Sequence, residues 1–163
     1  MPSYPTVPSL LEDPDLSRQW VLRRLQRALT LDLAATALES GIAVTARDPD
    51  RETARLLAGD ARRRSEVIRT LIETLGSVPY SSIGLARAGA RVGGTLLGLL
   101  GGWAWRMPLR KLATHTLSEY DALLAFVDGA EGIELDLTAQ VGPLLESAQR
   151  DLKALAVTAP RTA

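Results

Sequence analysis

The chain contains no cysteine and only one histidine, His115. The absence of cysteine excludes disulfides, thiolate metal sites and a cysteine nucleophile, and imidazole chemistry is confined to one position. Aromatic residues are also scarce, with three Trp, three Tyr and one Phe, so the core must be built from Leu, Ala, Val and Ile. Ala and Leu are strong helix formers. The composition therefore favours an all-α protein and argues against a zinc site or a Ser–His–Asp triad.

Net charge is lacking too, because 19 basic residues balance 19 acidic ones. This balance gives no general case for nucleic-acid binding, and we expect no nucleic-acid partner. The distribution is uneven, however, since no acidic residue lies between Glu73 and Glu119. Five basic residues fall inside this gap: Arg87, Arg91, Arg106, Arg110 and Lys111. Such a segment suits an anionic membrane surface or an acidic partner, or its arginines are the solvated ends of a core helix.

The most distinctive stretch runs from Gly89 to Arg106 and is rich in glycine and leucine. Glycines at four-residue spacing leave a helix face without side chains, which lets another backbone approach closely. The uncharged part, 92–105, is shorter than the roughly 20 residues that span a bilayer, so we expect a buried or interfacial helix. Trp103 and Trp105 next to Arg106 match interfacial membrane anchors, or they belong to the core.

The expected helix that contains Gly89–Arg106, called the glycine helix below, has two alternative partners. It forms the seam of a homo-oligomer, or it packs within the chain against the first helix. The second possibility arises because the first helix carries a second apolar stripe that needs a cover: Leu31, Ala35, Leu38 and Ile42.

Proline and glycine signals divide the chain into a single helical domain over 14–157, a flexible N-terminal segment (1–13) and a frayed C-terminus (158–163). Asp13 and Pro14 begin a helix that runs to about residue 46, and Asp48 and Pro49 begin one that Gly76 ends. Ser81 or Ser82 should cap the glycine helix, which Met107 and Pro108 should break or kink. A fourth helix then covers 109–128, and a fifth covers about 137–155 with a kink or late start at Pro143. The first residues lack the apolar run of a signal peptide, so we expect a cytoplasmic location. The basic, acid-free segment adds the expectation that the protein lies at the inner membrane face.

Several polar residues fall on apolar helix faces. Asp60 and Arg64 are one turn apart within the stripe of the second helix and should pair. Asp32 leans inward on the first helix, and Glu119 and Tyr120 lie on the inward side of the fourth, with His115 at its edge. Buried charges are costly unless paired, which predicts a buried polar network of these residues.

Two long helices, a crossover and two further helices indicate a four-helix bundle with one extended connection. The segment from Gly59 to Leu71 and the later Gly93–Gly98 and Tyr120 resemble the ferritin-like superfamily, nearest to demethoxyubiquinone hydroxylases and small bacterial relatives without an assigned role. The resemblance covers Leu16 to Leu155 and implies a ferritin-like four-helix bundle with an extra glycine-rich apolar helix in the crossover.

The metal ligands of that superfamily do not carry over. A di-iron site needs a carboxylate from each of two helices and Glu-x-x-His from each of two others. Arg63 stands where the resemblance places the histidine of the second helix, and on the last helix Glu146-Ser-Ala-Gln149 replaces Glu-x-x-His, with Glu146 facing water. We therefore expect no cofactor, and we expect Arg63 or Arg64 to bond Asp32 and Asp60 in place of iron.

The sequence favours a ferritin-like bundle with no catalytic residues that acts as an interaction or peripheral-membrane module. The alternative is an oxidoreductase with an atypical iron site built from Asp32, Asp60, His115 and Glu119. The resemblance implies that a quinone-like substrate, or another apolar ligand with an isoprenoid or acyl chain, would lie along the apolar wall over 96–105.

Overall fold

The computed structural model describes residues 14–80, 84–127 and 137–156. These residues form helices and no strand, which confirms the all-α prediction. The helices are α2 (Pro14–Thr45), α3 (Asp50–Thr74), α4 (Gly84–Leu100), α5 (Gly102–Val127) and α6 (Leu137–Ala156). The expected N-terminal segment, the caps at Asp13, Ser81 and Ser82, and the frayed C-terminus all lie outside the described residues.

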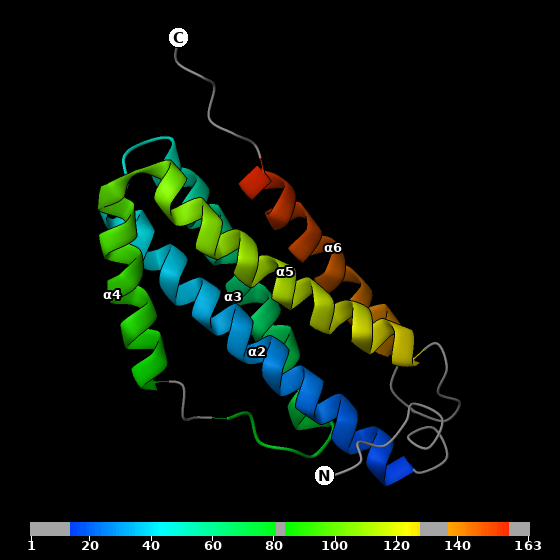
Figure 1. Ribbon diagram of the computed structural model, residues 1–163. Helices are drawn as coiled ribbons and strands as arrows, with labels where there is room; N and C mark the ends of the chain where they lie inside the picture. The colour runs from blue at the N-terminus through cyan, green and yellow to red at the C-terminus, as the bar shows by residue number, and fades with distance from the viewer. Residues whose placement is uncertain (1–13, 81–83, 128–136, 157–163) are drawn as a thin grey trace, which may run out of the picture.

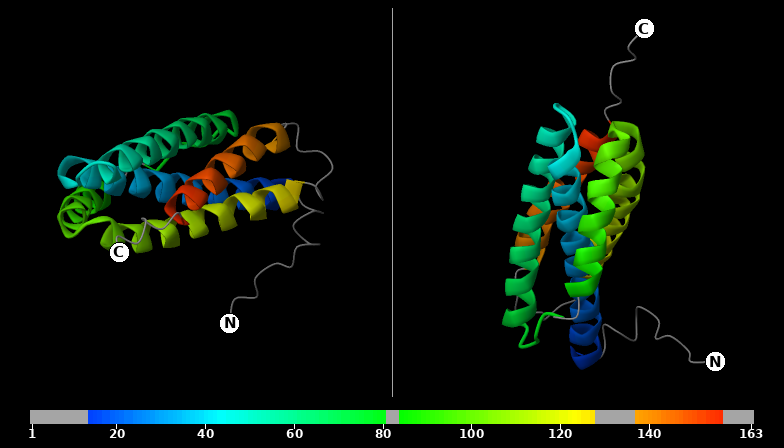
Figure 2. Two further views of the ribbon diagram at one scale, coloured as in Figure 1. Left: turned by 90° about the horizontal axis from the view of Figure 1, so that it is seen from above. Right: turned by 90° about the vertical axis from the view of Figure 1, so that its left-hand side faces the viewer.

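Four of these helices form a bundle, and α4 lies outside it (Figure 1). Helices α2 and α3 are antiparallel neighbours, and α5 and α6 form the second antiparallel pair. Helix α4 belongs to the crossover between the pairs and packs along the C-terminal half of α2, as the views in Figure 2 show. The bundle with an extra helix in its crossover is therefore as expected.

The bundle core follows a heptad pattern, in which buried positions alternate at intervals of four and three residues. In α2 these buried positions are Val21, Leu25, Ala28, Asp32, Ala35, Glu39 and Ile42. In α3 they are Ala54, Leu57, Ala61, Arg64, Ile68 and Leu71, and Leu75 directly after the helix continues the pattern. Because the same spacing carries both leucines and charged residues, the charged residues are forced into the centre of the bundle.

The helix boundaries depend on glycine more than on proline. Gly76 has a φ of 71° and ends α3 as expected, with its N–H donating to the Glu73 carbonyl at 2.8 Å. The break between α4 and α5 falls at Gly101, whose φ is 93°, so the predicted break at Met107 and Pro108 is wrong. Pro108 lies in the second turn of α5, where its missing N–H costs a single helical hydrogen bond. Helix α6 likewise passes through Pro143.

Glycines let α4 touch the backbone of α2. A Cβ atom on Gly94 would overlap the Leu38 carbonyl, and one on Gly41 would overlap the Arg91 carbonyl. A Cβ atom on Gly98 would overlap the Thr45 hydroxyl, and that hydroxyl donates to the Thr95 carbonyl at 2.7 Å. The side of α4 that carries Gly94 and Gly98 is thus covered by α2 of the same chain, one of the two alternatives that the sequence left open.

Candidate functional site

A charged network lies in the centre of the bundle, and Arg64 of α3 is its hub. The Arg64 Nε donates to Asp32 Oδ1 at 2.9 Å, and Nη1 donates to Asp151 Oδ2 at 2.6 Å. All three side chains are buried. One guanidinium therefore joins α2, α3 and α6 at a single level of the bundle.

Two neutral groups complete the network. Ser147, one turn before Asp151 on α6, accepts a hydrogen bond from Arg64 Nη1 at 3.0 Å. The Tyr120 hydroxyl of α5 donates to Asp32 Oδ2, so both Asp32 oxygens have a partner and the fourth helix joins the network. Each bundle helix thus contributes at least one polar side chain.

Glu39 lies two turns beyond Asp32 on the same face of α2 and is also buried. Its Oε2 atom has no hydrogen-bond partner among the described residues. Burial raises the pKa of Glu39 well above its usual value, and the charge of nearby Asp151 raises it further, against the opposing charge of Arg64. Glu39 is therefore a buried carboxyl group that favours its protonated form.

The network holds more acid than base. Burial raises the pKa of Asp151 to about 6 despite its contact with Arg64, and it raises the pKa of Asp32 against the same guanidinium and the Tyr120 hydrogen bond. Burial alone would lower the pKa of Arg64, but Asp32 and Asp151 outweigh this effect and raise it. Arg64 is consequently always charged, whereas the carboxyl groups around it can take up protons.

The predicted network residues separate into two groups. Asp32, Arg64 and Tyr120 meet as expected. Asp60 instead pairs with Arg63 at 3.0 Å on the outer side of α3, so the expected bond from Asp60 to the inner network is absent from the described contacts. The reason is that Asp60 and Arg63 lie beside the heptad positions Ala61 and Arg64.

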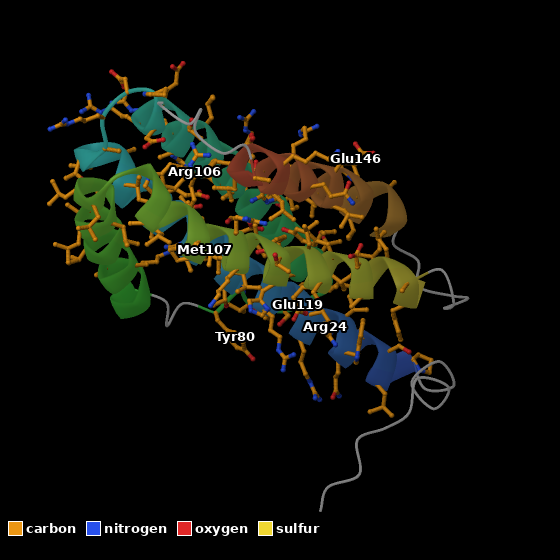
Figure 3. The ribbon with its side chains drawn as sticks, turned by 45° about the horizontal axis from the view of Figure 1, so that its top comes forward. Arg24, Tyr80, Arg106, Met107, Glu119 and Glu146 are labelled. Atoms are coloured by element: carbon orange, nitrogen blue, oxygen red, sulfur yellow. The ribbon has the colours of Figure 1, made fainter. Side chains whose placement is uncertain are left out.

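Glu119 also lies outside the network. Its Oε2 atom forms an ion pair with Arg24 Nη1 at 2.8 Å between α5 and α2, and Figure 3 shows both side chains on one side of the molecule. His115, one turn earlier, is exposed. Glu146 of α6 is exposed as well, as its position relative to the leucine stripe predicts.

These positions do not fit the alternative iron site. Asp32 lies in the core, whereas Asp60 pairs with Arg63, Glu119 pairs with Arg24, and His115 is exposed. Within the part of the chain that the structure describes, no three acidic or histidine side chains are grouped so as to hold a metal ion. The centre of the bundle is instead occupied by Arg64, which has no acceptor atom for a metal.

Sequence reasoning missed Glu39, Ser147 and Asp151. The heptad spacing of buried positions would have identified Glu39 and Asp151. On α6 the buried positions Leu137, Val141, Leu144, Ala148, Asp151 and Leu155 alternate by four and three residues. A stripe drawn only through the apolar residues of this helix passes through Leu152 and therefore overlooks Asp151.

The side of α4 that faces away from α2 is an exposed apolar surface. Val92, Leu96, Leu99 and Leu100 are each 59–74% exposed, and Met107 of α5 is 53% exposed. Apart from its own helix backbone, a Cβ atom added to Gly89 or Gly93 would meet no atom of the described residues within 4 Å. This apolar face, Val92, Leu96, Leu99 and Leu100, is called the α4 outer face below.

The basic residues near the α4 outer face have different environments. Arg91, Arg110 and Lys111 are exposed, and Arg87 is half-buried. Arg106 instead forms an ion pair with Asp50 of α3 at 3.3 Å and lies over the Trp105 ring.

Of the two tryptophans predicted as membrane anchors or core residues, the structure decides only Trp105. Trp105 is fully buried and packs with Ile42, Leu57 and Leu155, so its prediction as an exposed membrane anchor is wrong. The heptad spacing explains this burial, because Trp105 precedes the buried Leu109 by four residues. The side chain of Trp103 lies outside the described residues.

A separate hollow of about 450 Å³ lies between α2 and α5, and His115 and Glu119 both line it. Tyr80, from the segment after α3, forms part of its wall.

The fold and the network define an all-α bundle with an arginine-centred charge network in its core. No family model, curated protein or solved structure matches this chain. By length and composition alone, α2 could cross a membrane, with a mean hydropathy of 1.3 over its most apolar window. This helix is nevertheless the one that packs against α3, α4 and α5 in the bundle.

Proposed function

We propose that the protein is a ferritin-like, non-catalytic bundle that attaches to an anionic membrane surface through the α4 outer face. In this proposal the arginine-centred network stands where a ferritin-like enzyme would hold its metal, and it acts as a structural element. The observation that carries the proposal is the exposure of four large apolar side chains on one face of a helix.

The electrostatic setting supports anionic lipid as the partner. The segment over 74–118 contains no acidic residue, and Arg91, Arg110 and Lys111 within it are exposed. Each Lys or Arg near an anionic bilayer contributes about 1 kcal/mol of attraction. Leucines that enter the headgroup boundary add the hydrophobic term, about 1.5–3 kcal/mol for each side chain that becomes fully buried.

Flotation of the full chain with lipid vesicles tests the proposal. We expect binding to vesicles that contain phosphatidylglycerol, weaker binding to pure phosphatidylcholine, and a loss of binding as salt rises. The double variant Leu96→Ser/Leu99→Ser should bind at least about tenfold more weakly, because two apolar contacts with the bilayer are removed.

The matched control is Leu56→Ser/Val67→Ser, which changes two exposed apolar residues of α3 and should leave binding unchanged. Equal loss in both double variants, or no binding to anionic vesicles at low salt, would contradict the proposal. A second copy of the chain is the competing occupant of this face. Dimers in light scattering that only the α4 variant dissociates, without vesicle binding, would assign the face to self-association.

A further inference from the structure

A buried glutamine fixes one wall of the hollow between α2 and α5. Gln26 of α2 is 6% exposed, and its Nε2 atom donates to the Val78 carbonyl at 2.9 Å. Its Oε1 atom accepts the Tyr80 N–H at 3.1 Å. Both ends of one amide thus hold the segment after α3 against α2, although Tyr80 itself stays largely exposed. The result is an aromatic side chain held at the edge of a hollow, which we call the Tyr80 pocket.

The charge around the Tyr80 pocket is positive. Arg23 and Arg27 of α2 are one turn apart, and His115 of α5 also lines the pocket. The only acidic residue among the described lining residues, Glu119, is neutralised by Arg24 at 2.8 Å. Among the residues that the structure describes, Arg23 and Arg27 form no ion pair, and Arg23 donates a hydrogen bond to the neutral Gln19 at 3.5 Å.

The pocket also has an apolar part. Leu31 and Tyr80 lie on its wall. Thr30 also lines the pocket, and its hydroxyl donates a hydrogen bond to the Gln26 carbonyl. A hollow of about 450 Å³ falls within the size range of small-molecule sites, which combine apolar walls with a few polar groups that orient the ligand. Guanidinium groups favour carboxylate, sulfonate and phosphate oxygens, and a tyrosine ring favours a flat partner.

We propose that the Tyr80 pocket binds a small organic anion, in which a carboxylate or similar oxyanion is attached to a flat apolar ring. Arg27 and Arg23 bind the oxyanion, and Tyr80 and Leu31 contact the ring. This site is distinct from the α4 outer face and from the buried network, so it does not depend on the membrane proposal.

The single histidine provides a direct test, because its imidazole resonance in a tag-free, isotope-labelled sample belongs to one residue. We would titrate the full chain with naphthalene-2-carboxylate and follow the His115 ring signal. We expect a saturable shift, at least about tenfold weaker binding of inorganic phosphate, which lacks the ring, and similarly weaker binding of the neutral 2-naphthalenemethanol.

Two variants locate the site. Arg27→Glu should weaken naphthalene-2-carboxylate binding by at least about tenfold, and Tyr80→Ala should weaken it independently of charge. The matched control is Arg69→Glu, the same charge reversal at an exposed position of α3. Circular dichroism would verify that each variant is folded.

Three outcomes would overturn the proposal. The first is no His115 shift at millimolar probe. The second is equal binding of the neutral alcohol or of phosphate alone, and the third is equal weakening by Arg69→Glu and Arg27→Glu. All these measurements omit lipid, so their result is separate from that of the flotation experiment.

Discussion

Arg64 is surrounded by the buried carboxyl groups of Asp32 and Asp151, with Glu39 nearby. A buried ion pair is weak evidence of net stabilisation, because the desolvation of its charges offsets their attraction. Removing one member is nevertheless costly, since the remaining charges lose their compensation. The contribution of the network to stability is therefore best measured by truncating a single residue, Arg64.

Truncation of Arg64 to Ala should lower the free energy of unfolding by about 3–5 kcal/mol, because Asp32 and Asp151 would stay buried without a cation. Urea unfolding followed by circular dichroism measures this change. Arg69→Ala on the exposed side of α3 is the control and should change stability by less than about 0.5 kcal/mol. A loss below about 1 kcal/mol in Arg64→Ala would mean that the network is dispensable.

At the scale of the helix, the contact between α2 and α4 depends on backbone approach. Of two adjacent glycines in α4, Gly94 faces the Leu38 carbonyl and Gly93 faces open space. The same substitution at these two positions therefore separates packing from helix propensity, since Gly→Ala favours any helix by up to about 1 kcal/mol.

Gly94→Ala should destabilise the protein by about 1–3 kcal/mol, because the new methyl group forces α4 away from α2. Gly93→Ala should be neutral or stabilising by up to about 1 kcal/mol. Urea unfolding and amide hydrogen exchange over 84–100 would report both effects. If the two variants behave alike, the close contact of α4 with α2 is wrong.

The whole molecule should respond to pH through its buried carboxyl groups. Asp151 has a pKa of about 6 in the folded protein, above the value of about 3.9 expected for an unfolded chain. The folded state thus binds more protons than the unfolded state between these values, so stability falls as pH rises through about 6. The raised pKa values of Glu39 and Asp32 act in the same direction.

We therefore expect the free energy of unfolding to be at least about 1 kcal/mol higher at pH 5 than at pH 8. Glu39→Gln should flatten this dependence and raise stability at pH 8, because an amide in this position carries no charge. Glu146→Gln on the exposed side of α6 is the control and should keep the wild-type slope. Stability that increases from pH 5 to pH 8 in the wild type would contradict the buried acidic network.

The sequence by itself determined the helical class, the bundle topology and part of the network. Ala and Leu content, glycine at the end of α3 and the inward positions of Asp32, Arg64 and Tyr120 are local properties of the chain, so periodicity and propensity were sufficient. The same reasoning placed Glu146 in solvent and left open the partner of the glycine helix.

Only the tertiary structure decided which side chains meet. Asp60 and Arg64 are one turn apart on α3, yet Asp60 pairs with Arg63 of the same helix whereas Arg64 pairs with Asp151 of α6. Trp105 is apolar enough for a membrane or a core, and the heptad register placed it in the core. Pairing across helices depends on the register of several elements at once, and this register is set by the packing of the whole bundle.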